Sequence, residues 1–195
     1  MELNEKIDDG NIIYNNECNN STEQCCILDN IKFHAVDSAF KGVVLTPICE
    51  IQHSKADYLT ICQIIPLKQV FEEYLIDKGL KPREILGLET ITKNKYGNTY
   101  SEFIDKYLKN QVIRFYFLPE NNDKFEASLI DFNLVESILI KDFDKYKKIC
   151  EIKNPWKEDI IASYASYCVR IGTNDYTSDF LEKIMKKISN LKKEK

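Results

Sequence analysis

The residues with the most chemical potential lie between positions 49 and 57, where a thiol, an imidazole and two carboxylates stand close together in sequence. They are Cys49, Glu50, His53, Lys55 and Asp57. This polar segment separates two apolar runs, 43–45 and 58–66, whose β-branched and aromatic residues predict buried strands. Because a polar connection between buried strands commonly carries function, we predict a functional face here.

A zinc site is one chemistry that this segment allows. Cys49 and His53 are zinc-ligand types four positions apart, and a third and fourth ligand would have to come from residues such as His34 or Cys62. The spacing demands neither of them. A Cys–His nucleophile pair is a second alternative, although residues so close in sequence rarely reach the oriented geometry that it needs.

A structural role is the interpretation that we favour for the same segment. In it Cys49 points into the core, while Glu50 and Lys55 form an ion pair at the surface. We therefore expect no cofactor, and zinc at Cys49 and His53 remains the alternative.

Two charged residues interrupt a predicted hairpin of apolar strands, 111–118 and 125–132. They are Arg114 and Asp131, and charges in such strands either face solvent or are buried in pairs. The alternate positions 113, 115 and 117 are the more apolar set, so we predict that Arg114 lies on the outer face. We expect it to form an ion pair with Glu126 or Asp131.

The clearest helix is predicted over 155–171. Asn154 and Pro155 suit its start, and an apolar stripe begins at Trp156, which we expect to be largely buried. Arg170 stands at its end, where a cation favours the helix dipole. We also predict that Arg170 pairs with Glu50 and joins the two ends of the chain.

Apolar periodicity predicts further helices over 67–78 and 102–110, a short one over 82–86 and a last one over 177–191. Residues 1–30 are polar and weakly periodic, and we interpret them as a flexible arm whose thiols fit no standard zinc spacing. Residues 31–195 would form a single domain with C-terminal helices. The predicted class is α+β, a small bent antiparallel sheet or an SH3-like barrel packed against amphipathic helices.

Composition limits the classes of function. The chain has 27 basic and 31 acidic residues, a net charge of −4, which argues weakly against general nucleic-acid binding. The apolar runs are too short to span a membrane, and the polar start MELNEKIDDG predicts no secretory signal. We expect a cytoplasmic protein whose seven cysteines are reduced, without membrane association.

Two stretches carry a resemblance. Residues 42–51, GVVLTPICEI, followed by KADYLTICQIIPL, form the first, and residues 154–172, NPWKEDIIASYASYCVRIG, form the second. They resemble the opening and closing signatures of a group of uncharacterised bacterial proteins. Glu50 stands where Asp is commoner in that group, which moves the carboxylate by one methylene. The strand order is also similar to the SH3-like barrel of bacterial toxin endoribonucleases, at the level of fold alone.

From these features we predict an intracellular binding or adaptor module of a bacterial regulatory or defence system, with a protein partner. The alternative is a metal-dependent or toxin-like nuclease or hydrolase on an SH3-like barrel, which would use Glu50, His53 and Arg114.

Overall fold

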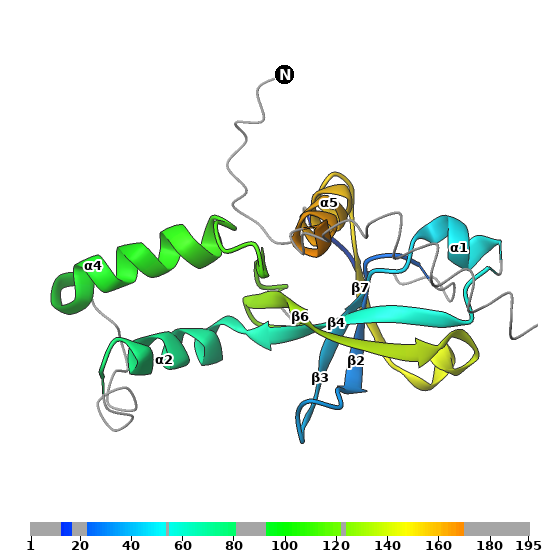
Figure 1. The fold of residues 1–195 in the computed structure, drawn as a ribbon, viewed down its shortest axis with the longest axis horizontal. Coiled ribbons are helices and arrows are strands. Elements are labelled where there is room, and N and C mark those ends of the chain that lie inside the picture. Colours follow the sequence, from blue (N-terminus) through cyan, green and yellow to red (C-terminus); the bar gives the residue numbers. More distant parts are fainter. Residues whose placement is uncertain (1–12, 17–22, 54, 81–92, 122–123, 170–195) are drawn as a thin grey trace, which may run out of the picture.

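Seven antiparallel strands form one sheet, in the order β1-β7-β2-β3-β4-β6-β5 (Figure 1). This computed structural model describes residues 13–16, 23–53, 55–80, 93–121 and 124–169. The strands are β1 (Tyr14–Asn15), β2 (Cys26–Lys32), β3 (Ala39–Val44), β4 (Tyr58–Pro66), β5 (Phe115–Leu118), β6 (Ser128–Leu139) and β7 (Lys148–Ile152). The helices are α1 (Ile48–Gln52), α2 (Leu67–Asp77), α4 (Lys93–Phe103) and α5 (Trp156–Val169), with a π-helical segment η2 (Ile104–Leu108) and a 3-10 segment η3 (Ile140–Lys145).

The predicted α+β class is confirmed. The four apolar runs predicted as strands belong to one sheet, as β3, β4, β5 and β6. Among the described residues, β1 and β5 are the two edges of the sheet. The sheet is therefore open, and it does not close into the SH3-like barrel given as the other possibility.

Both faces of the central sheet are buried, which explains why its strands read as continuous apolar runs. Successive residues of a strand point to opposite faces. Ile27 and Val43 belong to the apolar cluster beneath α5, whereas their neighbours Leu28 and Val44 belong to a second cluster on the other face. η3 contributes the buried Phe143 to this second cluster.

Gly42 lets β3 fit between its neighbours. A Cβ atom at this position would overlap the Cγ2 atom of Ile61 on β4, and it would also meet the Cγ1 atom of Ile31 on β2 at 3.4 Å. Since both neighbours are fully buried, neither has room to move away. The glycine seen in the sequence therefore marks a close approach of strands.

The predicted boundary at residue 30 is wrong for the described part of the N-terminal segment. Tyr14 lies in β1 and β2 begins at Cys26, and the residues from Cys25 to Leu28 are fully buried. The tertiary contacts of these residues outweigh the polar composition around them, because β2 pairs with both β3 and β7. Cys25 and Cys26 are therefore core residues, and burial raises the pKa of the Cys25 thiol to about 12.

The helix predicted over 155–171 is observed as α5, and it packs against the sheet as the predicted class requires. Ile160 is fully buried, and Trp156, Ile161, Tyr164 and Tyr167 pack around the same cluster. Trp156 itself is partly buried, and it packs against this cluster from the first turn of α5, as predicted for the start of the apolar stripe.

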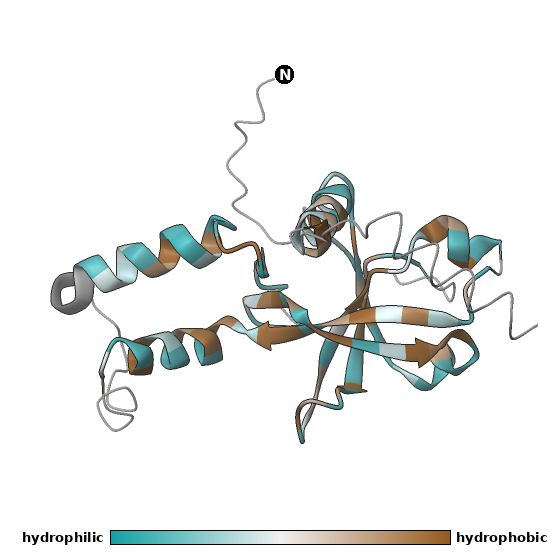
Figure 2. Ribbon diagram, viewed as in Figure 1, coloured by the Kyte–Doolittle hydropathy of each residue, from teal (hydrophilic) through white to brown (hydrophobic). Residues whose placement is uncertain are grey.

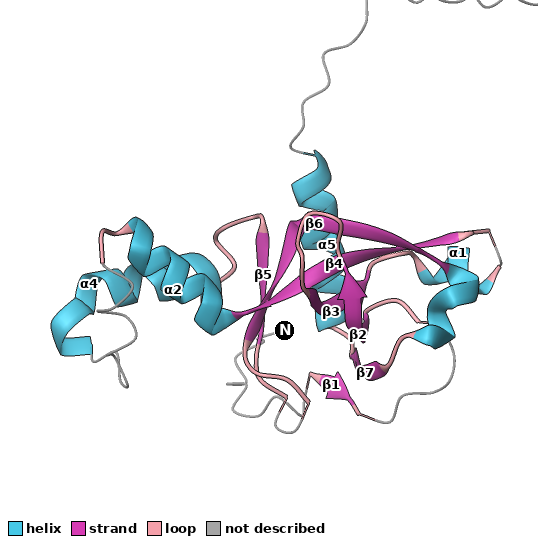
Figure 3. Cartoon of the chain, turned by 90° about the horizontal axis from the view of Figure 1, so that it is seen from below, coloured by secondary structure: helices cyan, strands magenta, loops and turns pink. Residues whose placement is uncertain are grey.

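Two helices project from the sheet and form what we call the arm, made of α2, α4 and η2; the sheet with α1, η3 and α5 is the body. Figures 1 and 3 both show α2 and α4 side by side, extending beyond one end of the sheet. α2 continues directly from β4, which confirms the helix predicted over 67–78, and Gly79 follows it with a φ of 90°. The arm leads back into β5 through η2.

The start predicted for the second helix of the arm is wrong, because α4 already begins at Lys93. The prediction relied on an apolar stripe, and the sequence KNKYGN at the start of α4 offers little of one. The short helix predicted over 82–86 and the last one, over 177–191, lie outside the described residues.

Hydrophobic residues are distributed differently among the elements. Figure 2 shows hydrophobic segments interrupted by hydrophilic residues along the strands and along α2, whereas the coloured part of α4 is mostly hydrophilic. No described helix is both long enough and apolar enough to cross a membrane.

Candidate functional site

The polar segment predicted as the functional face forms α1 and the loop that follows it. Cys49, Glu50, His53, Lys55 and Asp57 are all exposed. The prediction that Cys49 points into the core is therefore wrong. The helix turns its other side inward: Ile48 and Ile51, three positions apart, are partly buried, and Ile51 packs against the second cluster.

The side chains of this segment are not joined to one another in the described part of the chain. The predicted ion pair between Glu50 and Lys55 is absent there; instead the backbone N–H of Lys55 donates to the carbonyl of Glu50 at 2.9 Å. Arg170 lies outside the described residues, so its pairing with Glu50 stays a prediction.

Within the described ranges, no group of three or more potential metal ligands comes together. The two residues considered as further zinc ligands have other surroundings. His34 bonds through Nδ1 to the carboxylate of Glu136, which raises the pKa of His34, and Cys62 is fully buried in the cluster beneath α5.

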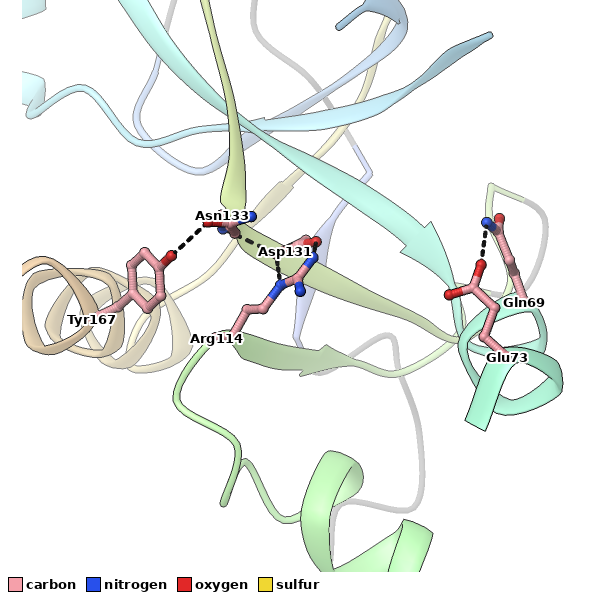
Figure 4. A network of polar contacts seen from close by, with 6 residues as sticks. All are labelled: Gln69, Glu73, Arg114, Asp131, Asn133 and Tyr167. Atoms are coloured by element: carbon pink, nitrogen blue, oxygen red, sulfur yellow. Dashed lines mark hydrogen bonds and ion pairs between the residues drawn. The ribbon is translucent and has the colours of Figure 1, made fainter. Parts of the chain in front are cut away.

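Arg114 and Asp131 form a two-pronged ion pair, as predicted (Figure 4). Arg114 Nε donates to Asp131 Oδ1 at 2.7 Å and Nη2 donates to Oδ2 at 2.6 Å. Asp131 is fully buried, while the side chain of Arg114 is 45% exposed. This carboxylate raises the pKa of the guanidinium, which therefore stays charged.

The pair belongs to a network that joins three elements (Figure 4). The backbone N–H of Asn133 donates to Asp131 at 3.0 Å, and the side chain of Asn133 accepts a hydrogen bond from the Tyr167 hydroxyl, also at 3.0 Å. The register of β6 shifts between Asp131 and Val135, so Asp131 borders a bulge and Asn133 lies within it, while Tyr167 comes from α5. The network therefore fixes this bulge between the start of β5 and the end of α5.

Arg114 precedes β5 and is exposed, as predicted, but the face predicted for the strand residues that follow it is wrong. Tyr116 and Leu118, in the same alternate set as Arg114, are buried beneath α5, whereas Phe115 and Phe117 pack against the arm. The error has a simple cause: the strand is covered on both faces, so the more apolar set does not identify the core face.

The arm contains an apolar groove that the sequence did not reveal. It is a cavity of about 420 Å³ between α2 on one side and α4 with η2 on the other. Six of its lining residues are hydrophobic: Leu67, Phe71, Tyr100, Phe103, Ile104 and Leu108. The remaining lining residues are Ala127 and three charged ones, Lys68, Glu120 and Glu126.

Aromatic rings hold the two sides of the groove together. The ring of Phe71 meets the ring of Phe103 at 4.5 Å in an edge-to-face arrangement, and Tyr107 stacks on Phe103 at 4.7 Å. Such pairs contribute about 0.5–1.5 kcal/mol each beyond their buried area. Phe71 and Phe103 belong both to this cluster and to the groove lining, so the groove has a fixed wall.

A charged cluster fastens the same helices on the solvent side. Glu102 of α4 accepts from Lys78, at the end of α2, at 2.9 Å and from Lys106 of η2 at 2.8 Å. These ammonium groups, Lys106 first, lower the pKa of the Glu102 carboxyl to about 2. The ammonium group of Lys78 also lies 5.3 Å from the ring centre of Tyr74.

The charged residues of the groove differ from this cluster because they are left without ion pairs in the part of the chain that the structure describes. Lys68, Glu120 and Glu126 are all exposed, and no described charge of opposite sign lies within ion-pair distance of them. The groove thus combines an apolar floor with charges that are available to a ligand.

The comparisons with known proteins give no family for this chain. No protein-family model matches it, and no curated protein matches it. The resemblance of the two quoted stretches to a bacterial group therefore stays a prediction.

Proposed function

We propose that this chain is a non-enzymatic binding module, an adaptor of a regulatory or defence system, that holds an apolar segment of a partner protein in the arm groove. The observation that carries the proposal is the groove itself. Its volume of about 420 Å³ lies in the range of ligand sites, roughly 300–1,000 Å³. Two helices side by side with apolar residues between them also offer the geometry in which a third amphipathic segment docks.

The fixed walls of the groove support this role. Phe71 and Phe103 are held by other aromatic rings, so their positions do not depend on a ligand. A preformed site loses less conformational entropy when it binds, which leaves more of the contact energy for affinity.

The enzyme alternative has less support from the geometry. Arg114 already pairs with Asp131. The other two residues of that hypothesis, Glu50 and His53, belong to α1 and its end, which Figures 1 and 3 place at the end of the sheet away from the arm. The binding role uses residues that do lie together.

Filling the groove tests the proposal. Ala127 lines it, and the carbonyl of Ala127 accepts the N–H of Leu67 at 2.8 Å, so Ala127→Trp adds bulk at a fixed backbone position. The purified full chain is used to select peptides of about 12 residues, roughly three helical turns, from a displayed library. The control is Ala35→Trp, the same change at an exposed position outside the groove.

We expect the wild-type chain and the control to select the same apolar peptides, and Ala127→Trp to bind them at least about tenfold more weakly. Circular dichroism and thermal melting verify that both variants are folded. Equal binding by all three proteins, or no peptide selected above background, would overturn the proposed function.

A further inference from the structure

A second cavity adjoins the arm groove. It measures about 350 Å³ and lies on the body, with a lining of Asp29, Ala39, Phe40, Lys41, Ile64, Pro66, Phe125, Glu126 and Ser128. Glu126 lines both cavities. Pro66 and Ser128 of the second cavity are the chain neighbours of Leu67 and Ala127 in the groove, and the Leu67–Ala127 hydrogen bond ties these strand ends together.

The two cavities therefore form one continuous surface from the arm to the body, with Glu126 on the ridge between them. Its side chain is exposed and belongs to no ion pair with a described residue. Its backbone is held, since the carbonyl of Glu126 accepts the hydroxyl of Ser128 at 2.7 Å. A carboxylate on a fixed backbone between the two cavities can pair with the cationic side chain of a ligand that occupies both of them.

Charge around this surface favours a cationic ligand. Its lining holds three carboxylates, on Asp29, Glu120 and Glu126, against two ammonium groups, on Lys41 and Lys68. An excess of carboxylates repels phosphate, which disfavours a nucleic acid or an anionic membrane as the occupant. A protein segment with Lys or Arg fits both the charge and the apolar groove.

We infer that the partner is a cationic amphipathic peptide segment that spans both cavities. Its apolar side chains occupy the arm groove, and a Lys or Arg beside them pairs with Glu126 at the crossing. This inference rests on the proposed function, because the apolar anchor is the segment that the groove binds. It specifies two further properties of the partner: its positive charge, and its path from the arm groove into the cavity on the body.

The experiment uses peptides of about 12 residues that carry Leu or Phe at positions i, i+3, i+4 and i+7. One set has Lys beside the apolar stripe, a second has Gln at the same positions, and a third has Glu. Binding to the full chain is measured at low and high salt. The variants are Glu126→Gln, and Glu158→Gln as a control that removes the same charge from α5, outside both cavities.

The Lys set should bind the wild-type chain most tightly and the Glu set most weakly. Glu126→Gln should weaken the Lys set by about two- to fivefold, the size of an exposed ion pair, and should leave the Gln set unchanged. The preference for Lys should also decrease with salt. Glu158→Gln should behave as the wild type does.

Failure of this inference differs from failure of the proposed function. Equal binding of the Lys and Gln sets, or equal weakening by both charge variants, would overturn the cationic partner while the apolar groove stands. If no set binds, or if Ala127→Trp has no effect on any of them, the groove is not a binding site and both proposals are overturned.

Discussion

The body and the arm are held together in different ways. In the body, strands distant in sequence pair across the whole sheet, and apolar clusters bury both of its faces. The arm is joined by one small cluster, in which Val70, Tyr74, Phe103 and Leu129 are the buried members, and by the ion pairs of Glu102. Several described apolar residues of the arm, among them Leu67, Phe71, Tyr107 and Leu108, are only partly buried.

Because of this difference, we expect the body to supply most of the stability and the arm to supply the binding surface. Burial of apolar surface is the main source of folding stability, so the body supplies most of it. Apolar surface that is left incompletely covered is available to a partner, and the arm has such surface in its groove. Regions with few buried contacts also open at lower free energy than the core.

Phe132→Ala should destabilise the body strongly. Phe132 is 1% exposed, and its ring lies 5.5 Å from that of Tyr164 and 6.1 Å from that of Tyr167, both on α5. The cavity left behind should lower the free energy of unfolding by about 3–5 kcal/mol. Urea denaturation measures it, with Phe132→Leu as the milder control. A loss below about 1 kcal/mol would show that α5 adds little to the core.

Arg114→Met should destabilise the chain by about 2–4 kcal/mol, because the buried Asp131 carboxylate loses its partner. Because the side chain of Arg114 is 45% exposed, we expect a loss of stability near the lower end of this range. The double variant with Asp131→Leu should recover part of this loss, since it removes the unpaired charge. If the double variant is no more stable, the loss comes instead from the guanidinium packed 4.9 Å from the ring centre of Phe115.

The sequence predicted those parts of the fold that depend on neighbours along the chain. The period-two and apolar patterns located β3 to β6, and the helix start at Asn154 was close to that of α5. The partner of Arg114 was narrowed to Glu126 or Asp131, the two carboxylates of the next predicted apolar strand, and the structure shows Asp131.

The candidate site could not be predicted in the same way. The apolar faces of α2 and of the segment before β5 were visible as helical stripes, with Phe71 and Phe103 among them. A stripe does not tell whether it faces the sheet or another helix, and these two helices face each other beyond the sheet. The segment 49–57 was predicted as a functional face from its residue types, yet its chemically active side chains are exposed on α1 and on the loop that follows it.

Trp156→Ala should cost about 1–2 kcal/mol, less than a fully buried Trp, because its side chain is partly exposed at the start of α5. Ile160→Ala should cost about 2–5 kcal/mol, since Ile160 is fully buried on the same helix. Chemical denaturation of both variants gives the comparison. The reverse order would mean that the first turn, and not the middle, holds α5 to the body.

Phe103→Ala should loosen the arm while the body persists. Phe103 joins the rings of Phe71, Tyr74 and Tyr107. If the arm opens by itself, the change in global stability is limited to about 1 kcal/mol, whereas amide protection in α2 and α4 falls strongly. Hydrogen exchange followed by mass spectrometry distinguishes the two parts. An equal fall of protection in the strands would show that body and arm unfold as one unit.

The smallest expected effect is that of Glu102, and its dependence on pH identifies it. Lys106 and Lys78 lower the pKa of this carboxyl from its ordinary 4.5 to about 2 in the folded chain. A folded pKa below the unfolded one means that the pairing stabilises the arm at pH values above about 4.5 and is lost as the pH falls through about 2. The effect is small because water reaches all three side chains, which are 39–45% exposed.

Hydrogen exchange in α2 and α4 should therefore be faster in Glu102→Gln than in the wild type near neutral pH. The difference should shrink as the pH falls from about 5 to about 2, since the wild-type carboxyl then also loses its charge. Glu73→Gln is the matched control, because Glu73 on α2 accepts a hydrogen bond from the neutral Gln69 at 3.1 Å and, among the described residues, belongs to no ion pair (Figure 4). Amides of the body should not respond to either change. A difference between wild type and Glu102→Gln that stays constant across this pH range would mean that the Glu102 side chain holds the arm by packing and not by its charge.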